Sequence, residues 1–421
     1  MKYPNDYSNT ISGGLVMKKT AITIAALLLC SSQALASGYM IPEQGAKAMG
    51  MGNAFSAIAD DASANWFNPA GLSFQENNAS VSATLVYPLN DFEAGGQTYS
   101  ATKGVHVVPQ AYARYGLENS KLSFGLGVNS PFGLSVDWTD SGAPFSQLAA
   151  GADSVTFSEI QAVHVNPNVA FQMNDNLSVA AGFSYYNAFK VHLDGQSLKI
   201  GGSGDGFGGN IAALYKADAF SVGLSYRSSV KVDISGTAVG GPGMAILGLE
   251  GIGANANTSV TFPDLITAAI TFSPSRNWLV SVQADRINWE KFNEIVIDYD
   301  PSTLNIATGT TSTIPENWKA TTAIRLGVEY AYNQNTKVRV GYTNDPTPVN
   351  ATDFSPRLPG NDRQLVSLGY GKDFSDNLTM DLAYAYVWLA DRTAAAPTNA
   401  AYHGVYKSVV HLIAGGVTYH F

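Results

Sequence analysis

The chain has 421 residues, of which 14% are charged and 45% hydrophobic, and its formal net charge is −9. A typical soluble domain has roughly 25% charged residues, so this chain is poor in charge for its length. The negative charge and the lack of any Lys/Arg cluster argue against a nucleic-acid partner, because binding phosphates requires clustered basic residues.

The first predicted element is a secretory signal peptide. A pair of lysines precedes the apolar run 21–30, and Ala-Leu-Ala at 34–36 has the small-x-small pattern of a cleavage site. We expect residues 1–36 to be removed. Residues 1–16 precede a complete signal peptide, so we attribute them to the choice of an upstream start codon. The only cysteine, Cys30, lies in the apolar run. The mature chain is therefore predicted to have no disulfide and no thiol chemistry.

The next element, residues 37–78, lacks the alternation of a strand and is too apolar for a free tail. Its segment 59–72, ADDASANWFNPAGL, contains small residues that suit close packing, and Asn68-Pro69 suits a turn. The residues that follow have the pattern of a wide barrel, whose lumen must hold water or a plug. We therefore expect 37–78 to form a hatch inside that lumen.

From 79 to 421 the sequence alternates like strands. Alternate residues from Ile413 to Phe421 are mostly apolar or aromatic. In segments 222–234 and 323–330 the charged residues occupy odd-numbered positions, so they lie on one face of the predicted strand. Lipid-facing and lumen-facing residues alternate in this way in a membrane β-barrel. No apolar run after the signal peptide reaches the roughly 20 residues that a membrane helix needs.

The connections between these strands alternate between short and long. Short polar turns lie near residues 119, 175, 217, 276, 334 and 376, and longer linkers lie near 88–103, 131–154, 195–205, 236–258, 300–317, 345–362 and 391–404. This pattern predicts an all-β fold, a 14-stranded antiparallel transmembrane β-barrel with its short turns in the periplasm and its long loops outside. The alternative is a secreted or periplasmic soluble β protein.

A family resemblance extends from the hatch to the C-terminus. The run QGAKAMGMGNAF, followed by ADDASANWFNPAGL, resembles the N-terminal hatch of the FadL-type outer-membrane transporters, and Asn68, Pro69 and Ala70 match their hallmark Asn-Pro-Ala motif. Segments 224–232, 318–327, 356–363 and 375–386 continue the resemblance. It implies a fourteen-stranded barrel with a hatch, in the outer membrane of a Gram-negative bacterium.

The resemblance also implies a function. The family carries hydrophobic molecules inward, chiefly long-chain fatty acids and in some branches aromatic hydrocarbons. The implied route is capture at apolar outer loops, binding in the lumen beside the hatch, and lateral exit through a wall opening at the third strand. We expect a monomer that contacts outer-membrane lipid and lipopolysaccharide, and that uses no cofactor and no metal. The alternatives are uptake of neutral aromatic compounds and a general porin.

The third predicted strand contains the candidate for the wall opening. The resemblance implies a kink formed by Gly125, Gly127, Asn129, Pro131 and Gly133. Proline cannot donate to a strand ladder, and two glycines precede it here. The residues alone favour a strand that simply ends at Pro131, whereas the resemblance favours the kink.

A fatty acid carboxylate in an apolar pocket needs a cation or several donors. Lys319 shares the parity of Arg325, which predicts that it faces the lumen, and it matches a lysine that the family places near the carboxylate. Lys190 shares the parity of Tyr186, although the family's fatty acid carriers often have an arginine near this position. The alternative for both lysines is a solvated lumen charge paired with Asp or Glu.

Two outer loops, 242–252 and 144–150, are unusually apolar. They supply the candidates for a capture groove, Met244, Ile246, Leu247, Leu249, Phe145 and Leu148. Exposed apolar patches often mark interaction sites. The alternatives are loops that pack on each other and a contact with lipopolysaccharide.

No motif in the sequence indicates an enzyme. The six histidines lack the spacing of metal ligands, and there is no Gly-x-Ser-x-Gly elbow or persuasive triad. Residues 201–206, GGSGDG, resemble a nucleotide or calcium loop but open no helix, so we expect a flexible surface loop. Asp60 and Asp61 are expected to hydrogen-bond within the hatch rather than to act as an acid–base pair.

Overall fold

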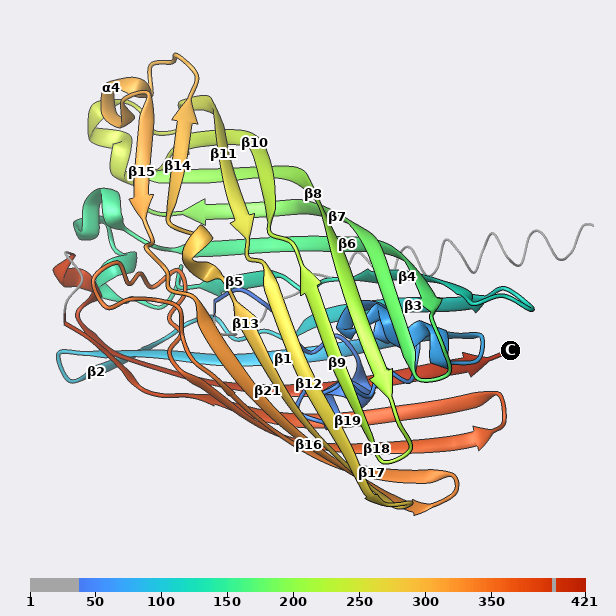
Figure 1. Ribbon diagram of the computed structural model, residues 1–421. Helices are drawn as coiled ribbons and strands as arrows, with labels where there is room; N and C mark the ends of the chain where they lie inside the picture. The colour runs from blue at the N-terminus through green and yellow to red at the C-terminus, as the bar shows by residue number, and fades with distance from the viewer. Residues whose placement is uncertain (1–37, 396–398) are drawn as a thin grey trace, which may run out of the picture.

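The computed structural model describes residues 38–395 and 399–421, so the predicted signal peptide and Cys30 lie outside the described part of the chain. Fourteen antiparallel wall strands close into a barrel, and the N-terminal segment lies inside it (Figure 1). This confirms the predicted fold class. Strand β1 pairs with β21 from Asn78 opposite His420 to Glu93 opposite Val405, which closes the wall.

The wall consists of both continuous and interrupted strands. The elements are β1 (Asn78–Ala94), β2 (Gln97–Ser100), β3 (His106–Gly116), β4 (Leu122–Asn129), β5 (Gly133–Asp137), β6 (Phe157–Gln172), β7 (Leu177–Asp194), β8 (Leu198–Lys216), β9 (Phe220–Arg227), β10 (Val230–Gly240), β11 (Gly253–Phe262), β12 (Leu265–Ser275), β13 (Trp278–Ile287), β14 (Glu294–Tyr299), β15 (Thr311–Pro315), β16 (Thr321–Asn333), β17 (Thr336–Asp345), β18 (Arg363–Ser375), β19 (Leu378–Leu389), β20 (Arg392–Ala394) and β21 (Gly404–His420). Five pairs, β4–β5, β9–β10, β11–β12, β13–β14 and β15–β16, are each one wall strand in two pieces.

Short helices lie in the hatch and in the outer loops. They are α2 (Ala46–Gly50), α3 (Ala64–Phe67), α4 (Asn305–Thr308), η1 (Pro69–Phe74), η2 (Pro144–Ser146), η3 (Leu148–Asp153), η4 (Pro242–Leu247), η5 (Trp289–Lys291) and η6 (Ala400–Tyr402). Helices α2, α3 and η1 belong to the hatch. Among the described residues, no helix is both long and apolar enough to cross a membrane.

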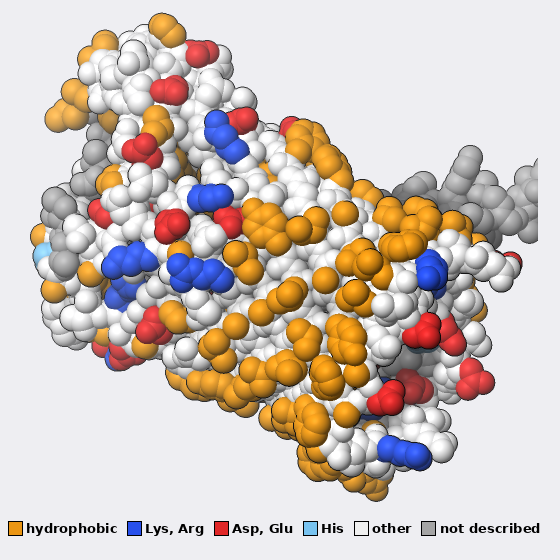
Figure 2. Space-filling model, in the orientation of Figure 1, with side chains coloured by type: hydrophobic (Ala, Val, Ile, Leu, Met, Phe, Trp, Pro, Cys, Tyr) orange, Lys and Arg blue, Asp and Glu red, His pale blue; other side chains and the backbone are white. Residues whose placement is uncertain are grey.

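The wall alternates as a membrane barrel does. Ile270, Val282 and Leu326 point outward and are exposed, whereas Gln283 and Arg325 face the lumen and are buried. Figure 2 shows the exposed apolar side chains gathered in a band over the half of the barrel that holds the short turns. Beyond this band, β10, β11, β14 and β15 extend as a lobe at the end that holds the long loops (Figure 1).

All six predicted short turns are present, but the connection from β7 to β8 differs from the prediction. It comprises only residues 195–197, because residues 201–206 belong to β8 and not to a surface loop. These glycines allow close approach to a neighbouring strand. A Cβ at Gly204 would overlap the backbone oxygen of Asp233 in β10. The expectation of a flexible loop was wrong because glycine also serves tight backbone packing.

Candidate ligand-binding site

An apolar pocket lies in the outer half of the lumen. Its cavity volume is about 90 Å³, well below the roughly 300–1,000 Å³ that is usual for small-molecule sites, so it has room for only part of a long acyl chain. Its apolar lining is Tyr39, Leu134, Ile160, Val191, Leu193, Val260, Phe292, Ile295, Trp318, Val349 and Leu358. Such a lining favours an apolar ligand, because it offers few hydrogen-bond partners to a polar one.

A wider groove lies outside this pocket, between the start of β8, helix η4, strands β14 and β15, and the loop 346–362. Its cavity volume is about 540 Å³, and it includes Met244 and Ile314 among its apolar residues. Leu193, Ser355 and Arg357 line both the groove and the pocket. The two spaces are therefore neighbours, and together they run from the outer loops into the lumen.

Arg357 is the cation at this junction. The loop that holds it is anchored from several sides, since Trp138 Nε1 donates to the Pro356 carbonyl at 3.1 Å and Arg392 Nε donates to the Gly360 carbonyl at 3.0 Å. Arg357 Nη1 donates to Ser355 Oγ at 3.3 Å, whereas its Nε is buried with no hydrogen-bond partner in the described structure. The guanidinium thus has donor capacity left for an anion.

Glu316 is a second charged group in the pocket lining. It lies between β15 and β16, beyond the apolar band, and accepts a hydrogen bond from Trp318 Nε1 at 2.9 Å. Burial raises the pKa of Glu316 to about 7, although the Arg357 guanidinium and the Trp318 N–H act in the opposite direction. The charge of the pocket therefore changes near neutral pH.

The inner end of the pocket is formed by Tyr39 of the hatch and the aromatic side chains around it. The ring centroid of Tyr39 lies 4.8 Å from that of Trp289, 5.4 Å from Phe292 and 5.6 Å from Trp318. On its other side it lies 6.0 Å from Phe132 at the break between β4 and β5. Tyr39 thus connects the ligand pocket to the interrupted third wall strand.

The third wall strand is interrupted at residues 130–132, where the family resemblance favours a kink. Met40 forms an antiparallel bridge with Phe132, flanked by hydrogen bonds from Ile41 N to Pro131 O at 2.8 Å and from Gly133 N to Tyr39 O at 2.9 Å. The hatch therefore pairs directly with the break. Pro131 does not end the strand, because the chain continues as β5.

Beyond this break, among the described residues, strand β5 has no ladder of backbone hydrogen bonds on the side that faces β3. Strand β3 pairs with β4 only from Ala111 to Gly116, and its residues 106–110 pair with β1 alone. Strand β5 pairs with β6. Within the described structure no strand ladder joins β3 to β5, so the backbone hydrogen bonding of the wall is open between them.

Gly125 and Gly127 are needed for close packing against the hatch. A Cβ at Gly127 would lie 2.5 Å from Asn65 Nδ2, and a Cβ at Gly125 would overlap Asn65 Oδ1 and approach Leu72 Cδ1 at 2.5 Å. Asn65 Nδ2 in turn donates to the Asn166 carbonyl of β6 at 2.9 Å. These glycines make room for a hatch side chain against the third strand.

Asn129 ends β4 and joins the hatch to the wall. Its Nδ2 donates to Gln44 Oε1 at 3.0 Å, and its Oδ1 lies 2.9 Å from His164 Nδ1. Gln44 Nε2 also donates to the Ser130 carbonyl at 3.1 Å. The polar side chain next to the break is therefore held by the hatch through Gln44 and by β6 through His164.

The Asn-Pro-Ala motif is a structural element of the hatch. Asn68 caps η1 by accepting from Ala70 N at 3.1 Å, while its Nδ2 donates to the Ser56 carbonyl at 2.9 Å and to the Ala213 carbonyl of β8 at 3.1 Å. Pro69 begins η1, where a missing N–H has no cost. One asparagine thus fixes the hatch internally and to the wall.

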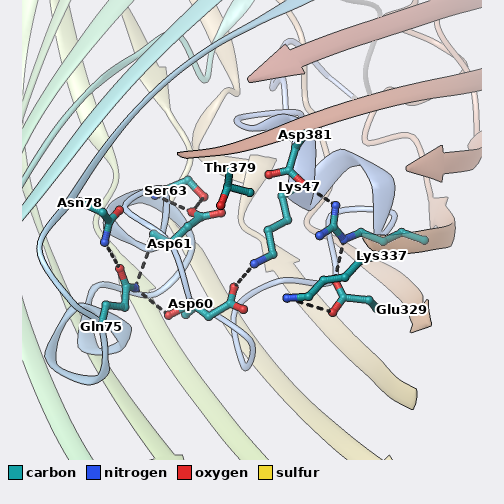
Figure 3. A network of polar contacts seen from close by, with 12 residues as sticks. Lys47, Asp60, Asp61, Ser63, Gln75, Asn78, Glu329, Lys337, Thr379 and Asp381 are labelled. Atoms are coloured by element: carbon teal, nitrogen blue, oxygen red, sulfur yellow. Dashed lines mark hydrogen bonds and ion pairs between the residues drawn. The ribbon is translucent and has the colours of Figure 1, made fainter. Parts of the chain in front are cut away.

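A polar network joins the hatch to the wall at the short-turn end of the lumen (Figure 3). Lys47 pairs with Asp60 at 2.7 Å, and Asp61 accepts hydrogen bonds from Ser63 N and Oγ at 2.8 and 2.5 Å. Both aspartates thus serve hatch bonding, as expected from the sequence. Deeper in the lumen, Glu43 of the hatch pairs with Arg363 of β18 at 2.6 Å.

The two predicted lysines do not line the pocket. Lys319 is exposed, because β16 begins only at Thr321 and the parity of the strand does not extend to the segment before it. Lys190 is half-exposed and pairs with Glu159 at 2.9 Å, next to a bulge that shifts the register of β7. The prediction that both face the lumen was therefore wrong, although the alternative for Lys190, an ion pair, is present.

The six apolar loop residues predicted to form a capture groove differ in their surroundings. Met244 lines the groove, Leu249 and Phe145 are buried, and Ile246, Leu247 and Leu148 are exposed without lining the groove. Phe145 packs against Phe92 and Trp138 at ring distances of 5.1 and 5.2 Å. The loops thus combine packing on each other with an apolar surface.

A known protein family matches nearly the whole chain. Residues 27–421 match the model of the family described as outer membrane protein transport protein (OMPP1/FadL/TodX). The chain belongs to this family. It is a β-barrel transporter family of the Gram-negative outer membrane whose members act on hydrophobic compounds.

Individual relatives cover most of the chain. A long-chain fatty acid transport protein of Escherichia coli O6:H1 is 26% identical, over 88% of this chain and 90% of its own. The structure of a Pseudomonas aeruginosa FadL homologue superposes with a TM-score of 0.76 and 17% identity, over 91% and 100%. That of the Pseudomonas putida toluene transporter TodX gives 0.66 and 17%, over 92% and 99%. These structures support the fold.

Proposed function

We propose that this protein carries long-chain fatty acids passively across the outer membrane. The observation that carries the proposal is that the outer groove and the apolar pocket are neighbours, with Arg357 at their junction. The groove captures the acyl chain, the pocket removes it from water, and no energy source is needed for flow down a gradient. Each fully buried CH₂ group contributes about 0.8 kcal/mol to capture.

Arg357 replaces the two lysines as the proposed carboxylate partner. A buried carboxylate requires charge-assisted hydrogen bonds, and a guanidinium can supply two in parallel. Arg357 lines both spaces and has an unused donor, whereas Lys319 is exposed and Lys190 is already paired with Glu159. The carboxylate would rest at the junction, where both the pocket and the groove can receive the chain.

The proposed exit is the opening in the wall between β3 and β5. It lies beside the pocket, because Leu134 of β5 lines the pocket and Phe132 contacts Tyr39. The pairing of Met40 with Phe132 closes the way from the lumen to this opening. Passage therefore requires the hatch segment around Tyr39 to leave the break.

Neutral aromatic compounds are a second candidate substrate. The two carboxylates in the lining, Glu159 and Glu316, disfavour an anion when both are charged, and the aromatic side chains around Tyr39 suit a ring. The named function of TodX, toluene transport, belongs to a protein of the same fold. A neutral ligand would be indifferent to Arg357.

Binding measurements in detergent distinguish these candidates. We expect oleate to bind the wild type, and Arg357→Gln to weaken it about tenfold or more, as expected for a charge-assisted bond of roughly 1.5–3 kcal/mol. Lys319→Gln is the matched control and should bind oleate normally. Toluene binding without oleate binding would favour the aromatic substrate. If neither ligand binds and the protein conducts ions freely in planar bilayers, a porin function replaces the proposal.

A further inference from the structure

The outer edge of the apolar band carries a row of outward-facing residues. Tyr226, Ile266, Arg286 and Thr322 lie opposite one another in the register of β9, β12, β13 and β16, and all four are exposed. Arg286 therefore projects from the lipid-facing side of β13. On this side it follows the exposed Val282 and the partly exposed Ala284. A cation at this depth lies at the boundary between hydrocarbon and head groups.

Three lysines surround this row. Lys319 lies three residues before Thr322, and Lys231 lies five residues after Tyr226. Lys291 reaches the same region through η5, since its Nζ is 3.1 Å from Ser229 Oγ. Lys319 lies two residues before β16 begins, and Ser229 lies between β9 and β10, so both are next to the strands that carry the row. Figure 2 shows basic side chains just beyond the apolar band on this face.

Two of these cations are not neutralised by a neighbouring acid. Lys291 pairs with Asp264 at 2.9 Å and Lys231 with Asp233 at 3.1 Å. Arg286 makes one long hydrogen bond, to Thr322 Oγ1 at 3.4 Å. Within residues 38–395 and 399–421, the Lys319 ammonium has no side-chain partner. Arg286 thus leaves one positive charge on the lipid-facing side, and the exposed Lys319 adds a second just before β16, on a protein whose net charge is −9.

We propose that Arg286 and Lys319, supported by Lys291 and Lys231, bind the phosphates of lipopolysaccharide in the outer leaflet. Arginine can hold a phosphate with two parallel hydrogen bonds, and basic clusters at the membrane boundary bind anionic lipid head groups. The exposed Ile266 and Tyr226 beside Arg286 offer an apolar surface to the acyl chains. This site is separate from the pocket, because none of these cations lines it.

The test compares two double variants that remove the same charge. Arg286→Gln/Lys319→Gln removes the proposed site, whereas Lys121→Gln/Arg276→Gln removes two exposed cations from the short turns at the other end of the barrel. Each purified protein is incubated in detergent with diphosphorylated lipid A or with its dephosphorylated form. Native mass spectrometry then measures the bound lipid, and oleate binding is measured in parallel.

We expect the site variant to bind diphosphorylated lipid A about tenfold more weakly than the wild type and the control variant, since each basic side chain near an anionic head group contributes several-fold. Loss of the phosphates should weaken binding to the wild type to a similar level. Equal binding by both double variants, or indifference to the phosphates, would overturn the proposal. Oleate binding should stay unchanged in all of them, so the result does not depend on the transport function.

Discussion

At the scale of single residues, the proposed carboxylate site depends on a balance between Arg357 and Glu316. Both line the pocket, and Glu316 has a pKa of about 7 because burial disfavours its charged form. A charged Glu316 competes with a ligand carboxylate for the guanidinium. A neutral Glu316 leaves Arg357 to the ligand.

This balance predicts a pH dependence. Below pH 7 Glu316 is mostly protonated, so oleate should bind more tightly at pH 6 than at pH 8, by up to about tenfold if only the neutral form is competent. Calorimetric titration at both values measures the ratio. Glu316→Gln should bind equally at both values, and toluene binding should not respond. A wild-type ratio that survives in Glu316→Gln would assign the effect to another group.

The sequence predicted least well which side chains line the site. Parity within a strand indicates which side chains face the lumen, and it held for Arg325. It failed for Lys319 because the strand begins two residues later, and for Lys190 because of a bulge. Arg357 was missed because it lies in a loop that folds into the lumen. The segment that contains it, PRLPGNDR, carried the family resemblance, which was the one available signal.

At the scale of elements, the interrupted third strand is coupled to the hatch. Met40 pairs with Phe132, and Asn65 occupies the space above Gly125 and Gly127. The resemblance favoured a kink at this position, whereas the residues alone favoured a strand that ends at Pro131. The reason for the two glycines was not predictable, because the side chain that they accommodate is more than fifty residues away in the sequence.

The glycine contact can be tested with a double-mutant cycle. Gly127→Ala should lower stability by about 1–3 kcal/mol, since the added methyl group overpacks Asn65 and Tyr112. In the Asn65→Ala background the same change should cost less, which gives a coupling energy. Thermal unfolding in detergent and hydrogen exchange of the hatch measure both.

Gly253→Ala is the control for this cycle, because its Cβ would meet no atom closer than 3.7 Å. It should leave hatch exchange unchanged. Equal costs of Gly127→Ala with and without Asn65 would mean that the glycine serves backbone freedom rather than packing.

At the scale of the whole molecule, the architecture was predictable from the sequence. Short turns and period-two alternation predict fourteen strands, since both are local features, and the comparison of structures supports the same fold. The shape of the lumen was not predictable, because the groove and the pocket are formed by loops whose packing depends on contacts distant in sequence, such as Trp138 with Pro356. The breaks in four neighbouring strands that shape the outer lobe were also not apparent.

The proposed transport route requires the hatch to leave the strand break, and a reversible crosslink tests this directly. Met40 and Phe132 are opposite residues of a non-hydrogen-bonded antiparallel pair, a geometry that brings their Cα atoms to about 4.5 Å and suits a disulfide. The only native cysteine, Cys30, lies in the predicted signal peptide. The double variant Met40→Cys/Phe132→Cys can therefore be crosslinked without competing thiols.

The measurement is oleate uptake into proteoliposomes by this variant before and after reduction, with each single cysteine variant as a control. We predict that the oxidised protein takes up little oleate, that reduction restores uptake, and that the single variants are insensitive to oxidant. Uptake by the fully crosslinked protein at the rate of the reduced one would contradict passage through the opening between β3 and β5.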